Sequence, residues 1–221
     1  MAVVQRQLLD DALEGHPRIA HVKADLSVSS STATAVEHAV ERFGGIDILV
    51  NNAGIMFERT VSEIQTEEWD FMMAVNLRAP LFLAQAALPH MRERGGGSII
   101  NIGSIEGLGA NPGHAAYCAS KSGIHGMTRA MALDLGADNI RCNAIAPGWI
   151  ASKLSETYLE SHPDPAAARD ALNRLHPLGR VGQPTDVGDL AVYLASERSS
   201  FLTGEIVVLD GGRTAKLPLP I

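Results

Sequence analysis

Basic clusters, cysteine pairs and metal-ligand spacings are all scarce in this 221-residue chain. Its 18 Lys and Arg residues are outnumbered by 25 Asp and Glu residues, which gives a formal net charge of −7. No basic cluster is long enough to follow a phosphate backbone, so we expect no nucleic-acid partner. Cys118 and Cys142 lack the spacing of a disulfide framework, a zinc site or a redox motif, and we expect both to pack as small apolar residues. The eight histidines also lack ligand spacing, so no metal is expected.

Targeting and membrane signals are missing as well. The first 15 residues contain acids and no continuous apolar stretch, so they do not have the form of a signal peptide. We also expect no membrane span, because no uncharged apolar segment reaches the required length. Residues 1–221 are therefore predicted to form one soluble, cytoplasmic domain with a single core.

Short β-branched runs alternate with longer helical patterns, which predicts βαβ units and a parallel sheet covered on both faces. The expected strands are 18–24, 46–51, 98–102, 140–146 and 205–209. The expected helices are 30–43, 67–94, 115–135 and 184–194, with Thr66 and Thr185 as candidate N-caps. The fold class is thus a doubly wound, Rossmann-like α/β sheet.

The segment 150–177 interrupts this alternation with charges, prolines and a short amphipathic pattern. A lid over a substrate site and a surface helical insertion are two interpretations of equal weight, because long excursions in compact domains are often functional.

Tyr117 and Lys121 are four residues apart in a predicted helix, so their side chains project from one face about one turn apart. At roughly 5 Å and an effective dielectric of about 20, Coulomb's law gives about 3 kcal/mol, or a pKa shift of roughly two units. We therefore expect the lysine to lower the tyrosine pKa from about 10 toward neutrality. Such a tyrosine could exchange a proton with a substrate.

Ser104 precedes Tyr117 by 13 positions and follows the predicted strand 98–102, at the edge of the sheet where open α/β folds bind ligands. This trio and its surroundings resemble the short-chain dehydrogenase/reductase family from about residue 18 to residue 212. The other features that carry the resemblance are the Asn51-Asn52-Ala53-Gly54 turn, Asn76, the Pro147-Gly148 pair and the segment 177–212.

The resemblance implies four catalytic residues. Tyr117 would be the general acid or base at the substrate oxygen, and Ser104 would donate a hydrogen bond to that oxygen. Lys121 would bind the nicotinamide ribose and lower the tyrosine pKa. Asn76 would anchor a water in a proton relay, and a helix-kinking amide bonded to backbone is a compatible role for it.

The resemblance also implies NAD or NADP as cofactor and a homo-oligomer, a tetramer or a dimer, built on the helices 67–94 and 115–135. Asp25 would lie beside the adenine, although an ordinary aspartate at a helix entry is the alternative. Besides Tyr117 and Lys121, the implied cofactor contacts are Asp25, Asn51, Ala53, Gly54, Pro147, Gly148, Ile150 and Ser152.

The chain departs from the family at its beginning, because it has no T-G-x-x-x-G-x-G turn to cradle the pyrophosphate. Residues 1–15 have the pattern of the helix tail that follows the family's second strand. We therefore expect the first two strands and the first helix to be absent, unless the native chain begins earlier. Since the missing first strand is central in the family, we expect unpaired sheet edges, and we expect the strand 18–24 to pair with 46–51 or with a partner subunit.

These patterns favour an NAD(P)-dependent oxidoreductase that interconverts a small-molecule secondary alcohol and a ketone. The main alternative is a fragment of this family that binds nucleotide weakly and serves as a binding or assembly subunit, or has no activity. A serine hydrolase using Ser104 is disfavoured, because its surroundings do not form a G-x-S-x-G elbow.

Overall fold

Four parallel strands form the centre of the molecule in the computed structural model, which describes residues 18–160 and 162–215. The predicted helix tail at 1–15 lies outside these residues. The strands pair in chain order, β1 beside β2, β2 beside β3 and β3 beside β4. They span Ile48–Asn51, Gly97–Ile102, Ile140–Pro147 and Ile206–Leu209.

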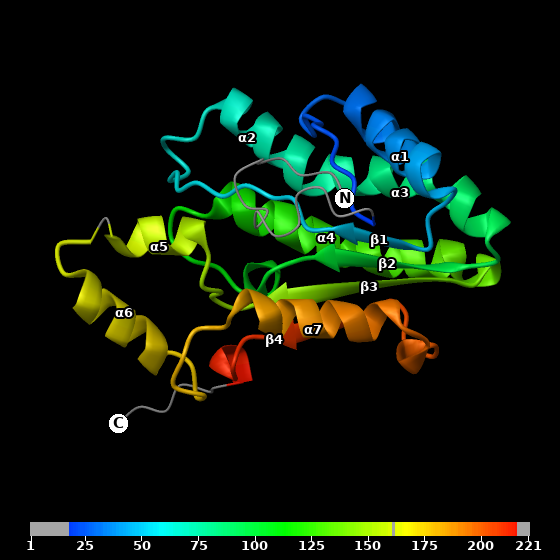
Figure 1. The fold of residues 1–221 in the computed structure, drawn as a ribbon. Helices are drawn as coiled ribbons and strands as arrows, with labels where there is room; N and C mark the ends of the chain where they lie inside the picture. Colours follow the sequence, from blue (N-terminus) through cyan, green and yellow to red (C-terminus); the bar gives the residue numbers. More distant parts are fainter. Residues whose placement is uncertain (1–17, 161, 216–221) are drawn as a thin grey trace.

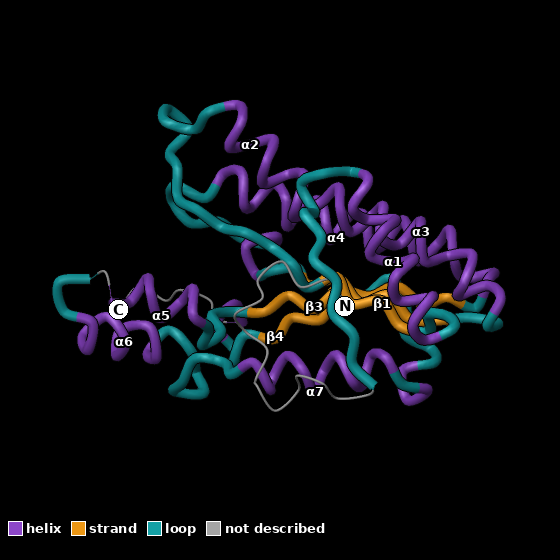
Figure 2. Tube along the Cα trace, turned by 45° about the horizontal axis from the view of Figure 1, so that its top comes forward, coloured by secondary structure: helices purple, strands orange, loops and turns teal. Residues whose placement is uncertain are grey.

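Helices cover both faces of this sheet (Figure 1). On one face lie α1 (Ser30–Phe43), α3 (Ala79–Glu93) and α4 (Ala115–Leu135), and α7 (Pro184–Ala195) lies on the other. Figure 2 shows α5 (Lys153–Glu160) and α6 (Pro165–Arg174) beyond one end of the sheet. The predicted doubly wound α/β class is thus confirmed.

The core follows from the alternation of side chains along the strands. Ile99 and Cys142 pack with Met91 of α3 and Leu135 of α4, all in one buried apolar cluster. On the opposite face, a second cluster joins sheet residues such as Ile100 to the α7 helix. Burial of both faces explains why these strands are almost continuously apolar.

Four of the five predicted strands are confirmed, but the segment 18–24 is not a strand of the sheet. Within it only Val22 lies in a β-bridge. Val22, Ala24 and Leu26 instead pack with buried residues of α1 and α3. The predicted pairing with 46–51 is therefore wrong, because a strand needs a neighbouring ladder and the described residues include no first strand to supply one.

The expected open edge is present at β1, which has no second neighbour in the part of the chain that the structure describes. Two of its apolar side chains are largely exposed, Ile48 by 47% and Val50 by 39%. In a sheet covered on both faces such positions are normally buried, so β1 is the weak point of the sheet.

The long helix predicted at 67–94 consists of α2 (Thr66–Met73), the π-helical turn η2 (Ala74–Arg78) and α3. Its span Thr66–Glu93 is long and apolar enough to cross a membrane by length and composition, although it is not uncharged, because Arg78 lies near its middle. Half of its most apolar window is buried inside the fold, as in the core helix of a globular domain.

Both predicted N-caps are displaced. The helix α2 begins after Gln65, whose N–H is bonded by the Glu68 carboxylate, and α7 begins after Gln183, whose N–H is bonded by Asp186. The N3 carboxylate holds the cap backbone in each case, so a threonine hydroxyl is not needed there.

Candidate active site

A cavity of about 1140 Å³ opens at the carboxyl ends of the strands. Its walls come from the loop after β1, the loop after β2, the first turns of α4, the loop after β3 and the helices α5 and α6. In the described part of the chain, the segment predicted as a lid or an insertion therefore contains two helices that flank the cavity. Parallel strands bring these loops to one edge, which is where open α/β sheets bind their ligands.

The structure brings the predicted catalytic trio together in this cavity. Ser104 follows β2 and caps the 3₁₀ turn η3 (Ile105–Gly107), where its Oγ accepts the Glu106 N–H at 3.1 Å. Tyr117 lies in the first turn of α4, and Lys121 follows one turn later. The Lys121 Nζ atom lies 5.6 Å from the centre of the Tyr117 ring.

Lys121 is held in place at its ammonium group. Only 5% of the residue is exposed, and Nζ donates a hydrogen bond to the Ile102 carbonyl at 2.8 Å. Burial lowers the Lys121 pKa to about 8, because a charged group loses hydration inside the protein. The remaining Nζ hydrogens can donate to an oxygen in the cavity.

The Tyr117 hydroxyl does not have the lowered pKa that the spacing predicted. Burial raises its pKa to about 12; the Ser104 hydroxyl opposes this shift, and the negative charge of Glu106 adds to it. The simple Coulomb argument failed because it left out the desolvation of the phenolate and the lowered pKa of the lysine itself. At neutral pH Tyr117 is therefore protonated and ready to donate.

Asn76 lies in the π turn η2, with 1% of its surface exposed. Its Oδ1 accepts the Ile55 N–H and its Nδ2 donates to the Ile55 carbonyl, both at 2.8 Å. Nδ2 also approaches the Ser120 Oγ at 3.1 Å. This amide thus fastens the loop after β1 to α4, and π turns are frequent at functional sites.

The predicted cofactor residues separate into two groups, which we call the nicotinamide half and the adenosine half. The nicotinamide half lines the cavity and consists of Tyr117, Lys121, Gly54, Pro147, Gly148, Ile150 and Ser152. The adenosine half consists of Asp25, Asn51 and Ala53, and none of them lines the cavity.

In the adenosine half the polar groups are only partly engaged, because both bonds to Asp25 end on Oδ1 and the buried Asn51 Oδ1 atom has no hydrogen-bond partner among the described residues. The exposed Asp25 carboxylate accepts the N–H of Ser27 at 2.9 Å and its hydroxyl at 2.7 Å, which lowers the Asp25 pKa. Buried Asn51 donates to Asn101 Oδ1 at 2.8 Å. These bonds are typical of a helix-entry aspartate, and they leave the Asp25 Oδ2 atom exposed, so the adenine contact and the helix-entry role both stay predictions.

The nicotinamide half fits the ribose and nicotinamide of a dinucleotide. A side chain added at Gly54 would place its Cβ 3.6 Å from Lys121 Nζ, and one at Gly148 would come within 2.8 Å of the Asp210 Cβ atom. At Gly148 a Cβ atom would clash with Asp210, so this position requires glycine, whereas at Gly54 a Cβ atom would make an ordinary contact. The Trp149–Ala151 backbone is fixed in turn by two hydrogen bonds with Gly182, at 2.8 and 2.9 Å.

Sequence reasoning left one polar group of the cavity out of the site. His114, 9% exposed, bonds Glu106 Oε2 through Nδ1 at 2.6 Å and Glu58 Oε1 through Nε2 at 3.3 Å. Burial lowers the His114 pKa, but the two carboxylates outweigh it and raise the pKa overall. The link between Glu106 and His114 spans only eight residues of an irregular connection, and no periodic pattern in the sequence indicates it, whereas the contact with Glu58 depends on long-range folding.

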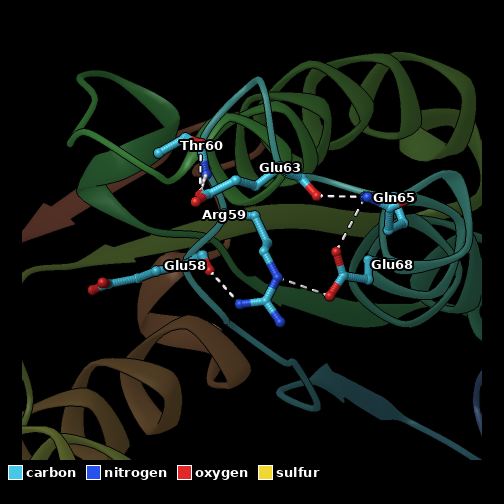
Figure 3. Close-up of polar contacts among 6 residues, drawn as sticks. All are labelled: Glu58, Arg59, Thr60, Glu63, Gln65 and Glu68. Carbon is cyan, nitrogen blue, oxygen red and sulfur yellow. Dashed lines mark hydrogen bonds and ion pairs between the residues drawn. The ribbon is translucent and has the colours of Figure 1, made fainter.

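A surface network holds Glu58 in position (Figure 3). Arg59 Nε bonds Glu68 at 2.9 Å, and its Nη1 donates to the Glu58 carbonyl at 2.8 Å. The Arg59 N–H also donates to the Gly113 carbonyl at 2.8 Å, next to His114. The Glu58 carboxylate points away from this network, and it is that carboxylate which reaches His114.

Comparisons with known proteins agree with this geometry. A family model described as enoyl-(acyl carrier protein) reductase matches residues 4–214. The chain is 41% identical to the 3-oxoacyl-[acyl-carrier-protein] reductase FabG of Thermotoga maritima over 80% of this chain and 70% of that protein. It is 37% identical to the D-beta-hydroxybutyrate dehydrogenase of Rhizobium meliloti over 90% of this chain and 79% of that one.

Solved structures show the same likeness. A gluconate 5-dehydrogenase from Burkholderia cenocepacia, in complex with NADP and tartrate, is 35% identical with a TM-score of 0.82, over 89% of this chain and 76% of that one. The aldohexose dehydrogenase of Thermoplasma acidophilum is 29% identical with a TM-score of 0.87, over 94% of this chain and 83% of that one.

A parallel α/β sheet with Ser104, Tyr117 and Lys121 at its carboxyl edge defines a Rossmann-like oxidoreductase. The chain belongs to the short-chain dehydrogenase/reductase family. It is an enzyme of the type that acts on CH–OH groups with NAD or NADP.

Proposed function

We propose that this protein interconverts a secondary alcohol and a ketone, with Tyr117 as the proton donor or acceptor at the substrate oxygen. The observation that carries the proposal is the meeting of Ser104, Tyr117 and Lys121 in one cavity. Relatives named for oxoacyl, hydroxybutyrate, gluconate and aldohexose chemistry support the reaction class without specifying the substrate.

Each residue has a task in this reaction. Ser104 Oγ donates a hydrogen bond to the reacting oxygen and orients it toward the Tyr117 hydroxyl. Tyr117, protonated at neutral pH, gives its proton to the oxygen of a ketone; in the reverse direction its phenolate takes the proton of an alcohol. The Lys121 ammonium binds the nicotinamide ribose and favours the phenolate when it forms. When bound, NAD(P) supplies or accepts the hydride.

Asn76 has a positioning role in this proposal. By holding both backbone groups of Ile55, it fixes the loop that carries Gly54 beside Lys121. Its amide also approaches Ser120, whose Oγ donates to the Tyr117 carbonyl at 2.8 Å. Asn76 therefore lies in the connection between the cofactor loop and the catalytic helix, where a water relay would run.

The test is nicotinamide absorbance with panels of secondary alcohols and ketones, using NAD and NADP. We expect turnover that falls by about 10²- to 10⁴-fold in Tyr117→Phe, which removes only the hydroxyl group that carries the transferred proton. Tyr193→Phe is the matched control, because Tyr193 lies on α7 with 42% of its surface exposed. Full turnover by Tyr117→Phe would contradict the mechanism.

A second candidate function is a binding or assembly subunit with little affinity for nucleotide. It is favoured by the position of Asp25, Asn51 and Ala53 outside the cavity that holds the other predicted cofactor residues. Fluorescence titration with NADH and NADPH separates the two candidates. A dissociation constant in the micromolar range supports the enzyme, and one in the millimolar range or no binding supports the subunit.

The lid, the oligomer and the location belong to the same proposal. We place the lid at 150–177, where α5 and α6 flank the cavity, and the protein in the cytoplasm. The homo-oligomer, a tetramer or dimer, would use the apolar surface on α3 and α4, where Leu133 is 86% exposed and Phe82 is 40% exposed. Light scattering after size-exclusion chromatography, with Leu133→Asp as the disrupting variant, tests the assembly.

A further inference from the structure

The acid–histidine cluster of Glu58, Glu106 and His114 lies in the wall of the same cavity as the catalytic trio. His114 is fixed from both sides by the two carboxylates, at 2.6 and 3.3 Å. The catalytic steps above use none of these three side chains. The His114 and Glu106 side chains are only 10% and 17% exposed, and the desolvation of such a pair costs free energy that mutual attraction repays only in good geometry.

Glu106 is tied directly to the catalytic serine. Its backbone N–H donates to Ser104 Oγ, so the carboxylate and the catalytic hydroxyl belong to one short 3₁₀ turn. The Glu106 Oε2 atom is hydrogen-bonded to His114 Nδ1 at 2.6 Å and accepts from the Cys118 thiol at 3.6 Å. Within the described residues, Oε1 has no hydrogen-bond partner, so it is available to accept a hydrogen bond in the cavity that Glu106 lines.

The cluster makes this wall of the cavity negative. Two carboxylates face one imidazole, so the sum is −1 when His114 is protonated and −2 when it is neutral. Its field reaches the reacting group, because Glu106 is one cause of the raised Tyr117 pKa. Arg213 lines the cavity from the turn η6 (Arg213–Ala215), on a different segment from the serine turn.

We infer that Glu106 selects the substrate: a neutral polyol or sugar-like alcohol in which a second hydroxyl, near the reacting carbon, donates a hydrogen bond to the Glu106 carboxylate. This inference rests on the proposed function. A substrate carboxylate or phosphate at the same place would meet the negative cluster and be rejected. A cation is not required, because Glu106, the carboxylate nearest the catalytic serine, already pairs with His114, while the second carboxylate, on Glu58, is about half exposed to solvent.

Glucitol and gluconate form a matched pair of probes, because they differ at one terminal carbon that carries a hydroxyl in the first and a carboxylate in the second. The experiment measures the dissociation constant of each by calorimetry, with and without saturating NAD. For the wild-type chain we expect glucitol to bind at least about tenfold more tightly than gluconate, the lower end for a hydrogen bond to a charged group.

Glu106→Gln keeps the size of the side chain and removes its charge. We expect it to weaken glucitol binding about tenfold, to strengthen gluconate binding, and so to bring the two constants close together. Glu67→Gln is the matched control, because it removes the same charge from the first turn of α2, outside the cavity. Circular dichroism verifies that both variants are folded.

Three outcomes would overturn the inference: no detectable glucitol binding, gluconate binding as tight as glucitol binding, or an unchanged ratio in Glu106→Gln. Tighter binding of 1-amino-1-deoxyglucitol than of glucitol would also overturn it, in favour of a cationic substrate. Binding does not depend on turnover, so the two proposals fail separately. Glu106-dependent binding without any oxidation would reject the proposed function alone, and oxidation of simple alcohols without glucitol binding would reject this inference alone.

Discussion

The two halves of the cofactor site differ in what their polar groups are bonded to. In the nicotinamide half, Lys121 keeps hydrogen-bond donors for a ligand, and glycines at 54 and 148 leave backbone close to the cavity. In the adenosine half, the Asp25 carboxylate is bonded to Ser27 and the Asn51 amide to Asn101. The halves thus differ in their place relative to the cavity, which the nicotinamide half lines and the adenosine half does not, and each half keeps polar atoms without a partner, such as Asn51 Oδ1.

Lys121→Met should have the largest effect of the substitutions that test this contrast. It keeps an apolar stem of similar length and removes the charge, so we expect kcat/KM to fall by at least about 10²-fold. Lys23→Met, at an exposed position, is the control and should leave kcat/KM within about twofold. Steady-state kinetics with the best alcohol of the panel provides the measurement, and a Lys121→Met protein with normal kcat/KM would remove the lysine from the site.

Asn76→Leu should be the most damaging of these changes for stability. It leaves the Ile55 N–H and C=O without their partner in a part-buried place, so we expect a loss of about 2–4 kcal/mol in the free energy of unfolding. Gln85→Leu, at an exposed position of α3, is the control and should change this free energy by less than about 0.5 kcal/mol. Urea denaturation measures both, and equal losses would show that the Asn76 contacts are unimportant.

A smaller, pH-dependent effect is expected at His125, which packs behind the serine turn. Its ring lies against Gly103 and Gly107, and a Cβ atom added at either glycine would come within 2.4 Å of it. Burial lowers the His125 pKa, and the positive charge of Arg129 adds to this shift. The unfolded chain then binds more protons than the folded chain just below about pH 6.5, so stability falls as the pH drops through that value.

His125→Leu should remove this dependence. Between pH 7.5 and 5.5 we expect the wild-type chain to lose up to about 1.4 kcal/mol more than the variant. His114 contributes with the opposite sign, because its pKa is raised, so its stabilisation is complete below about pH 6.5 and is lost as the pH rises. Urea denaturation at the two pH values gives the difference, with His114→Gln to isolate the second histidine. A parallel loss in wild type and His125→Leu would mean that His125 does not titrate there.

Asp25→Asn should have the smallest effect on nucleotide binding. The amide oxygen can still accept from Ser27, and the exposed side chain lies outside the cavity, so we expect the NADH dissociation constant to change by less than about twofold. Fluorescence titration of the variant beside the wild type is the test. A tenfold weakening would return Asp25 to the adenine site and break the contrast between the halves.

Prediction from sequence succeeded where local pattern determines structure. The helix expected at 115–135 is found as Ala115–Leu135, because its apolar period and its side-chain spacing are properties of the segment itself. It also placed Tyr117 and Lys121 on one face beside Ser104. The N-caps Gln65 and Gln183 lie one and two residues before the predicted ones. A sequence pattern does not decide whether a threonine hydroxyl or the carboxylate of the N3 residue will cap the helix.

The failures came from interactions that join distant parts of the chain. The segment 18–24 has a strand-like composition, but a strand forms only beside a hydrogen-bonded neighbour. The apolar residues of this segment pack against α1 and α3 instead. The Tyr117 pKa depends on burial and on Glu106, which spacing along a helix does not reveal. The acid–histidine cluster joins the loop after β1 to the connection between β2 and α4, so only the folded chain brings Glu58 to the other two residues.

The π turn around Asn76 also limits how this helix can change. A π turn holds one residue more than an ordinary helical turn, and each helical residue rotates the chain by about 100°. Deleting a single residue between Ala74 and Arg78 would convert the turn to a regular helix and keep α2 and α3 close to their present rotation, so the change would fall on the side chains of the turn itself. Asn76 could then no longer hold both backbone groups of Ile55, so the length of this short segment is under a stricter constraint than its composition.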